Sequence, residues 1–397
     1  MDVVIVSATR TAIGKFLGQF SVLTAPQLAA ATIKESLKRV SLKPGDANEV
    51  IMGNAISAGI GQNPARQAAI NSGIPNYVPT FTVNKVCGSG LKAVMLAAQS
   101  IKAGENEIVV AGGMESMSQA PHLLREGRKI KKYGDITKQE LLAYAGDYTL
   151  TDSMVYDGLW CAFNLCHMGD LAENLVKKEK ISRQRQDEYS LRSHRLAVEA
   201  TDRGTFKKEI VPIKINGKNV DIDEGPRRDT SLEKMAQLKT VFKGNTITAG
   251  NSSQLSDGAS ALIVMSKDKA KELGLKPLVT IEHYAQASTD PSWYTVAPVS
   301  AVKHLMLKYK YKIGDFDLIE LNEAYAAQNL KVIDELKIDT NRLNVNGGAI
   351  ALGHPIGCSG ARILTTLIYS MIDRKKKLGL ATLCIGGGEA IAMSVSR

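Results

Sequence analysis

The sequence lacks features that would place it in several common protein classes. Aromatic residues make up only 5% of the 397 residues, and no basic run with interleaved aromatic residues occurs. No apolar run reaches the roughly 18 residues of a membrane-spanning helix. A protein that stacks nucleic-acid bases on aromatic side chains is therefore disfavoured. A membrane protein is not expected.

Nucleotide-binding fingerprints and targeting signals are also missing. No G-x-G-x-x-G follows an expected strand, and no G-x-x-x-x-G-K-[ST] occurs. The first residues, MDVVIVSATRTAIG, lack the basic start and long apolar core of a signal peptide, and they are neither Arg-rich nor Ser-rich. We therefore expect a cytoplasmic protein that binds neither a dinucleotide nor a nucleoside triphosphate.

Cysteine is scarce, and the five present are Cys87, Cys161, Cys166, Cys358 and Cys384. An odd number in a long chain without a secretion signal favours reduced thiols. CAFNLCH, which contains Cys161, Cys166 and His167, has loosely metal-like spacing. No second ligand pair follows it, so no metal site is expected.

The composition is that of a globular protein with an excess of positive charge. Hydrophobic residues make up 44% and charged residues 23%, and the length suits two or three domains. The formal net charge is +10, with basic clusters in LLREGRKIKKYG, TFKKEI, GPRRD and DRKKKLG. These clusters are either solvated faces or a surface for a polyanionic partner, a nucleic acid or a phosphate-bearing small molecule.

Short apolar strands alternate with helical runs in the first 120 residues and again after residue 250. VVIVSA, EVIMGNAI, TFTVNKV and EIVVAGGM read as strands, and QLAAATIKESLKRV, NPARQAAINSG and GLKAVMLAAQSIKAG read as helices. This alternation predicts an α/β fold with a largely parallel sheet. Residues 121–250 are more charged and irregular, with one clear helix between an N-cap at Ser182 and a stop at Gly204.

The two alternating regions resemble each other. EVIMGNA near Asn54 parallels LIELNEA near Asn322, and the segments from CGSG to GGMES and from GCSG to GGGEA follow in the same order. This match pairs Ser89 with Ser359 and Gly112 with Gly386. We expect a duplicated α/β unit whose equivalent loops meet at one site.

Cys87, in NKVCGSG, lies where a strand is expected to hand over to a helix. It is a packing residue, a redox thiol or a nucleophile. The positive end of the helix dipole and free backbone N–H groups at that position favour a thiolate. Taken alone, a buried inert thiol remains the more common fate of a cysteine.

The second repeat supplies partners for such a nucleophile. His354 lies in a glycine-rich loop that suits a base activating Cys87. Cys384 at a strand end suits a general acid and base, and Gly386 offers a backbone N–H to an oxyanion. Asn322 follows a strand with its amide free to orient a water or an oxygen. A redox disulfide between Cys87 and Cys384 is the alternative, although neither lies in a C-x-x-C pair.

Six motifs together resemble the thiolase family along essentially the whole chain. They are NKVCGSGLKAV, HMGDLAEN, TAGNSSQLSDGA, LNEAYAAQ, NVNGGAIALGHPIGCSGARI and CIGGGEA. The resemblance implies two duplicated halves in a five-layer α-β-α-β-α core, with an inserted loop domain for CoA binding and oligomerisation, assembled as a homotetramer. The halves would span residues 1–120, completed by 251–274, and residues 275–397, with the loop domain at 121–250.

The resemblance also implies roles for matching residues. Cys87 would take the acyl group from a thioester with His354 as its base. Cys384 would remove a proton from the α-carbon of a second acetyl-CoA. Asn322, through a water, and His354 would form one oxyanion hole, and the backbone N–H groups of Cys87 and Gly386 the other. The positions that resemble CoA contacts are Leu159, His167, Met168, Arg227, Ala249 and Ser253.

These roles imply an enzyme that reversibly joins two acetyl-CoA into acetoacetyl-CoA and CoA by ping-pong covalent catalysis, with CoA thioesters as substrates and no cofactor. The His167–Met168 pair points to short acyl chains. The alternatives are a 3-ketoacyl-CoA thiolase of broader chain length, a non-catalytic lipid- or CoA-binding protein, and the redox protein. Departures from the usual motifs put chain length and CoA geometry in question; they are Tyr294, Tyr325, Gln254, Ser256, Lys234 and Glu389.

Overall fold

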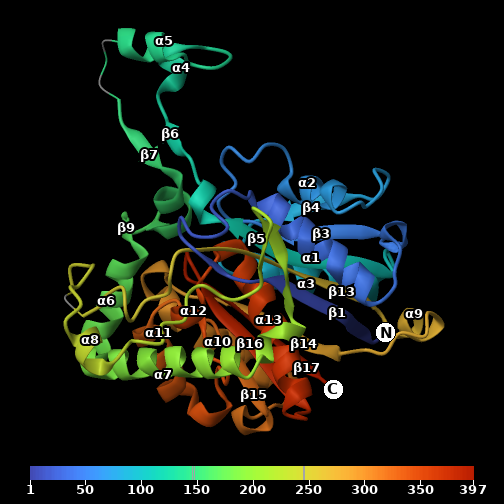
Figure 1. Ribbon diagram of the computed structural model, residues 1–397. Helices are drawn as coiled ribbons and strands as arrows, with labels where there is room; N and C mark the ends of the chain where they lie inside the picture. Colours follow the sequence, from blue (N-terminus) through green and yellow to red (C-terminus); the bar gives the residue numbers. More distant parts are fainter. Residues whose placement is uncertain (145, 147, 245) are drawn as a thin grey trace.

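The computed structural model describes residues 1–144, 146, 148–244 and 246–397. Within these residues the core is one mixed sheet of 11 strands with helices on both faces (Figure 1). Its main path runs β15 (Leu318–Leu321), β16 (Leu378–Ile385), β17 (Glu389–Ser396), β14 (Val279–Ser288), β1 (Val3–Thr11), β13 (Ser256–Ser266), β5 (Ile108–Ser116), β3 (Glu49–Gly53) and β4 (Thr80–Val83). The short strands β10 (Ile210–Val211) and β2 (Gly14–Lys15) pair with β1 and β13.

The two halves join where β1 pairs with β14, through a register that sets Val3 opposite Ile281. The expectation of a largely parallel sheet is wrong. Only β3 with β4 and β5, β15 with β16, and β1 with β10 run parallel, and the remaining pairs are antiparallel. The physical reason lies in the connections: β16 returns into β17 through a three-glycine turn, and a tight hairpin makes antiparallel neighbours.

Helices pack on the strands of each half and also lie between the two halves (Figure 1). α1 (Ala25–Arg39) and α2 (Pro64–Asn71) pack with the strands of the first half in one hydrophobic cluster. α10 (Ala297–Tyr309) and α11 (Ala326–Leu336) cover the strands of the second half. α3 (Ser89–Ala103) and α13 (Ile356–Asp373) lie together between the two halves and share a third cluster.

The two central helices meet at a pair of glycines near their N-termini. A Cβ on Gly90 would lie 2.8 Å from the backbone nitrogen of Ala361, and one on Gly360 would lie 2.5 Å from that of Leu91. Real side chains do not fit at such distances, so only glycine permits this reciprocal contact. The contact brings the loop before α3 and the loop before α13 to one place.

The chain between β5 and β13 forms the inserted segment. The antiparallel strands β6 (His122–Leu124) and β7 (Leu150–Asp152) carry α4 (Gly127–Ile130) and α5 (Lys138–Ala143) away from the body of the molecule (Figure 1). The rest of the segment holds β8 (Trp160–Cys161), β9 (Cys166–His167), α6 (Met168–Glu179), α7 (Arg183–Asp202), β11 (Ile213–Ile215), β12 (Lys218–Val220) and α8 (Leu232–Ala236).

α7 is the helix expected in this segment. Its N-cap Ser182 accepts a hydrogen bond from the Arg185 amide at 3.2 Å, and Gly204 follows its end with a φ of +70°. Both termini therefore match the expected cap and stop. α6 is a second long helix there that the sequence did not predict. α9 (Lys267–Glu272) and α12 (Ala349–Leu352) are short helices outside this segment.

Among the residues that the structure describes, no helix combines the length and the apolar character needed to cross a membrane.

Candidate active site

Cys87 lies in the loop between β4 and α3. The loop turns sharply at Val86, whose φ of +46° is left-handed, and α3 begins two residues after the cysteine. Cys87 packs against an apolar cluster that includes Met154 and Ile356, with Leu159 beside it. The residue keeps partial solvent exposure, so a substrate can reach it.

Burial raises the pKa of the Cys87 thiol to about 12. Hydrogen bonds from the backbone N–H groups of Gly386 and Cys87 lower this pKa, and the nearby charge of Glu115 raises it further. The backbone N–H groups thus favour the thiolate, as expected, but the loss of water around the sulfur outweighs their effect on the pKa. Cys87 rests as a thiol and needs a base.

Cys384 ends its strand beside the first cysteine. It lies in β16 opposite Ala390 and is 1% exposed. Burial raises the pKa of its thiol well above the ordinary value, and the charge of Cys87 raises it further. The two thiols therefore share one site, and both are protonated at rest.

His354 occupies the loop between α12 and α13. Its Nδ1 lies 2.5 Å from Ser359 Oγ, and that hydroxyl also donates to the Pro355 carbonyl oxygen at 2.8 Å. A hydroxyl has one proton, so Ser359 accepts from Nδ1–H, and Nε2 is the acceptor nitrogen of the ring. Burial, followed by the charge of Arg362, lowers the His354 pKa to about 3. The ring is thus neutral, with Nε2 ready to accept a proton.

Asn322 follows β15 and faces His354. Its Nδ2 lies 3.4 Å from His354 Nε2, and its backbone N–H donates to the Thr382 carbonyl at 3.1 Å. Its Oδ1 is buried without a partner among the described residues. A buried amide oxygen of this kind is an acceptor for a water or for a polar group of a substrate.

The neighbouring Glu323 anchors this part of the site. Its buried carboxylate accepts hydrogen bonds from Tyr189 Oη at 2.9 Å, Ser193 Oγ at 2.7 Å, Asn344 Nδ2 at 3.0 Å and the Ile350 amide at 3.1 Å. These donors lie on α7, on the loop after α11 and on α12. One charge therefore fixes the Asn322 strand end, the inserted segment and the His354 loop together.

Strand register corrects one part of the expected repeat. β3 sets Gly53 opposite Gly113 of β5, and β15 sets Leu321 opposite Thr382 of β16. Since Asn54 and Asn322 follow these strands, Gly113 is equivalent to Thr382. The sequence match of Gly112 with Gly386 is therefore wrong: Gly112 is equivalent to Ala381.

The corrected register places Glu115 where the second half has Cys384. Asn54 Nδ2 donates to Glu115 Oε1 at 2.6 Å, and the Gly357 amide donates to Glu115 Oε2 at 2.8 Å. In the second half, Asn322 is equivalent to Asn54, and Cys384 is equivalent to Glu115. Cys87 lies in the loop that is equivalent to the loop of Gly357. The molecule thus carries two versions of one constellation.

The six residues matched to CoA contacts are not all gathered at the cysteines. Leu159 packs in the cluster around Cys87, and the Met168 methyl carbon lies 3.6 Å from where a Cβ on Gly386 would be. The Ser253 amide donates to Ala324 O at 3.0 Å, beside the Asn322 motif. The other three lie farther out: His167 caps α6 and stacks on Phe242 at 4.7 Å, while Arg227 and Ala249 lie on exposed loops.

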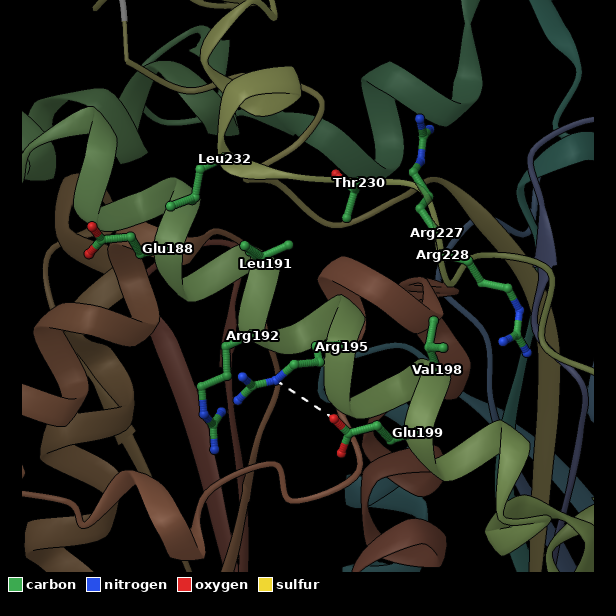
Figure 2. Close-up of a pocket in the computed structure, with 10 residues that line it drawn as sticks. All are labelled: Glu188, Leu191, Arg192, Arg195, Val198, Glu199, Arg227, Arg228, Thr230 and Leu232. Carbon is green, nitrogen blue, oxygen red and sulfur yellow. Dashed lines mark ion pairs between the residues drawn. The ribbon is translucent and has the colours of Figure 1, made fainter.

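A surface hollow of about 530 Å³ lies between α7 and the 227–232 segment. Figure 2 shows that the side chains around it do not converge: Arg227 extends away from Arg192 and Arg195, and Arg195 pairs with Glu199 at 3.8 Å. This hollow is separate from the cysteines. The Arg227 guanidinium therefore points away from the arginines of α7 (Figure 2).

Two departures from the expected motifs lie near the thiols. Tyr294 and Tyr325 are 3% and 8% exposed and pack in the same cluster as Cys384. Tyr294 Oη donates to the Met168 carbonyl at 3.0 Å. Burial raises the pKa of both phenols, and the charges of Cys384 and Cys87 raise them further. The acyl side of the site therefore has a bulky wall with hydroxyl groups.

Other departures have structural positions of their own. Gln254 Nε2 donates to the Ile350, Ala351 and Gly225 carbonyls at 3.0 to 3.2 Å. The backbone carbonyl of Gln254 accepts a hydrogen bond from the backbone N–H of His354 at 3.0 Å. Ser256 Oγ donates to Gln254 O at 2.9 Å, and Lys234 pairs with Asp229 on the surface. Gln254 therefore supports the His354 loop.

Sequence reasoning missed three further features. It used Ser359 only as a repeat marker, although its position five residues after His354 is a usable signal. It did not identify Glu115, because that residue is visible as an equivalent of Cys384 only in the strand register. It recorded Glu389 as a departure without its contact to Lys85.

No group of three or more His, Cys, Asp or Glu side chains is arranged to hold a metal ion in the described part of the chain. All five cysteines are free thiols.

The fold and the paired cysteines are those that the resemblance to thiolases implies, and comparison with protein-family models gives the same family. The thiolase N-terminal domain matches residues 3–268 and the thiolase C-terminal domain matches residues 275–397. The chain belongs to the thiolase family, which confirms the resemblance.

Curated relatives share its whole length. A protein of Cupriavidus necator named acetyl-CoA acetyltransferase is 50% identical over 405 residues, covering 100% of this chain and 99% of the relative. One of the same name from Pseudomonas aeruginosa is 48% identical over 402 residues, with the same coverage of 100% and 99%. A probable acetyl-CoA acyltransferase of Staphylococcus aureus is 48% identical over 401 residues, again covering 100% and 99%.

Proposed function

We propose that this thiolase is an acetyl-CoA C-acetyltransferase, which reversibly joins two acetyl-CoA into acetoacetyl-CoA and CoA. The observation that carries the proposal is that the half-buried Cys87 and the buried Cys384 share one site with the backbone N–H groups of Cys87 and Gly386, in a protein whose His354 is a neutral imidazole. The full-length relatives with that name support the substrate. The reaction needs no cofactor, since both substrates are CoA thioesters.

In the first half-reaction Cys87 takes the acetyl group. His354 Nε2 accepts the thiol proton while the sulfur attacks the thioester carbonyl, so that a carbon–sulfur bond forms to Cys87 and the bond to CoA breaks. Cys384, a thiol at rest, gives its proton to the departing CoA sulfur. The products are acetyl-Cys87, a protonated His354, a Cys384 thiolate and CoA.

In the second half-reaction the Cys384 thiolate removes a proton from the methyl group of a second acetyl-CoA. The resulting carbanion attacks the acetyl carbonyl on Cys87, the carbon–sulfur bond breaks, and acetoacetyl-CoA leaves. His354 returns its proton to Cys87. Every group is restored, and the two-step route gives ping-pong kinetics.

Negative charge develops on oxygen in both half-reactions. The Gly386 and Cys87 N–H groups already point at the Cys87 sulfur, so they are placed for the oxyanion of the acyl group. Protonated His354 and a water on Asn322 would serve the enolate oxygen. Such preorganised donors each contribute roughly 3–4 kcal/mol to transition-state stability.

Trapping the acyl-enzyme tests this proposal. Incubation with acetyl-CoA alone should add one acetyl group to Cys87, visible by intact-protein and peptide mass spectrometry. A Cys87→Ser variant should lose thiolysis, which would exclude a purely CoA-binding protein. An unlabelled Cys87 in the wild-type enzyme would defeat the mechanism, and activity found only after thiol oxidation would favour the redox alternative.

A 3-ketoacyl-CoA thiolase of broader chain length is the second candidate. The buried pair Tyr294 and Tyr325 argues against it, because two bulky phenols beside the thiols leave little apolar room for a longer chain. We expect thiolysis of acetoacetyl-CoA to exceed that of a medium-chain 3-ketoacyl-CoA. Equal kcat/KM values would favour the broader enzyme.

We further propose a cytoplasmic homotetramer that works in lipid metabolism without nucleic-acid or membrane partners. The inserted segment, residues 121–250, is our candidate for CoA binding and oligomerisation. Its projecting arm exposes Tyr133, Leu142 and Leu150, which suits burial against another copy of the chain. The net charge of +10 suits attraction of CoA phosphates, so kcat/KM should fall with added salt.

A further inference from the structure

Lys85 and Glu389 form an ion pair between the two halves of the molecule. Lys85 Nζ contacts Glu389 Oε2, and the side chains are 21% and 35% exposed. Lys85 lies two residues before Cys87, and Glu389 opens β17 three residues after Gly386. The pair therefore joins the two loops whose backbone N–H groups face the Cys87 sulfur. We propose that Lys85 and Glu389 are positioning residues that hold the Cys87 loop against the Gly386 turn.

The first half of the molecule explains why such a tie is needed. There Glu115 accepts the Gly357 amide at 2.8 Å and so fastens the His354 loop to the opposite half. The equivalent of Glu115 in the second half is Cys384, whose thiol must stay free to exchange a proton. The Cys87 loop thus lacks the carboxylate tie that its counterpart has, and Glu389 supplies one from beyond the Gly386 turn.

Both members of the pair are anchored by their own surroundings. The Lys85 amide donates to Ser89 Oγ at 2.8 Å, and Ser89 Oγ donates to Val86 O at 2.6 Å, which fixes the lysine on the first turn of α3. Ser288 Oγ donates to Glu389 Oε1 at 3.5 Å. At Gly388 a φ of +89° and a Cβ position 2.3 Å from Thr289 O admit only glycine, so the turn has one shape. The pair therefore links two ordered loops.

The expected consequence is a loss of rate with little loss of stability. A partly exposed ion pair contributes little to folding stability, because water and salt screen it. Its effect on the distance between the Gly386 N–H and Cys87 is more consequential, because a misplacement of about 1 Å can cost as much as 100-fold in rate. We expect the pair to act on kcat rather than on CoA binding.

The test uses the full-length protein and four single variants. Glu389→Gln and Lys85→Met remove the pair. Lys331→Met and Glu179→Gln are the controls: they remove a pair away from the site whose side chains are 22% and 29% exposed, and in which Lys331 also contacts Glu335 at 3.4 Å. We expect the first two to lower thiolysis kcat about tenfold. They should slow acetylation of Cys87 by the same factor and leave KM for CoA within about twofold. The control variants should keep wild-type rates, and all four should melt within a few degrees of the wild type.

A charge swap separates the ion pair from its individual residues. Lys85→Glu combined with Glu389→Lys should recover at least part of the rate that either single change loses. Wild-type rates in Glu389→Gln, a rise confined to KM for CoA, a fall in kcat explained by unfolding, or a swap no better than its single variants would each overturn the proposal. The inference rests on the proposed function, and acetylation of wild-type Cys87 tests that function separately.

Discussion

The two halves of this thiolase place Asn54 and Glu115, and Asn322 and Cys384, at equivalent positions, but these residues make different contacts. In the first half, Asn54 Nδ2 donates to Glu115, and Glu115 accepts from the Gly357 amide, so the carboxylate ties elements together, while Asn54 Oδ1 has no partner among the described residues. In the second half, Asn322 keeps its Oδ1 without a partner among the described residues, and Cys384 replaces the carboxylate. The halves therefore differ in the residue beside the asparagine: Glu115 is held by several donors, whereas the Cys384 thiol has no such ties among the described residues.

Loss of the Cys384 thiol should have the largest effect on the rates of thiolysis and condensation. Cys384→Ala removes the group that distinguishes the catalytic half, so thiolysis and condensation should fall by roughly 100- to 10,000-fold. Initial rates with acetoacetyl-CoA and CoA measure the effect. Cys358→Ala is the matched control, because Cys358 is also a fully buried thiol at the start of α13. Comparable losses in both variants would mean that packing, and not proton transfer, explains the result.

The two asparagines give the next largest contrast. Asn322→Ala should lower kcat about 100-fold with little change in stability, because it removes a donor and acceptor of the oxyanion site. Asn54→Ala should instead lower the free energy of unfolding by about 1–3 kcal/mol, because it strips a hydrogen bond from buried Glu115. Urea unfolding and steady-state kinetics on both variants check this. If the two effects were reversed, the assignment of the halves would be wrong.

The two serines at equivalent helix starts should differ more mildly. Ser359→Ala removes the acceptor that holds the His354 proton on Nδ1, and we expect kcat to fall about tenfold. Ser89→Ala leaves that histidine untouched and should cost about 1 kcal/mol of stability. ¹⁵N NMR of the imidazole reports the tautomer in the wild type and in Ser359→Ala. An unchanged tautomer with a normal kcat would remove Ser359 from the site.

A further contrast concerns the pH dependence of stability. Burial raises the Glu115 pKa from 4.5 to about 7, so the native state holds this proton more tightly than the unfolded chain does. Its contribution is full below pH 4.5 and is lost as the pH rises through 7. Over that window the stability of the wild type relative to Glu115→Gln should fall by roughly 1–3 kcal/mol. A difference that is flat across urea titrations at pH 4.5–8 would contradict the raised pKa.

Much of the site was predictable from short motifs. Cys87, His354, Asn322 and Cys384 each lie next to or at the end of a strand or helix whose apolar pattern is clear. The structure places Cys87 near Cys384 and His354 near Asn322. The Ser182 cap of α7 was likewise readable, because capping depends on neighbours within three residues. Local chemistry in a local pattern is what a single sequence records well.

The failures have a common physical cause. The resting state of Cys87 depends on how much water the folded protein removes from the sulfur, and that is set by residues distant in sequence such as Met154 and Ile356. The direction of the strands depends on how the connections fold back. The equivalence of Glu115 with Cys384 depends on hydrogen-bond register, which the sequence match between Gly112 and Gly386 misplaced.

The family, the duplicated halves and the residues proposed to react can be inferred from the sequence alone, because they depend on residue types at fixed local spacings. Only the tertiary structure decided that both thiols are protonated at rest, that His354 presents Nε2, and that Lys85 meets Glu389 across the two halves. Those properties arise from desolvation and from contacts between residues far apart in the chain, and they exist only once the two halves have packed.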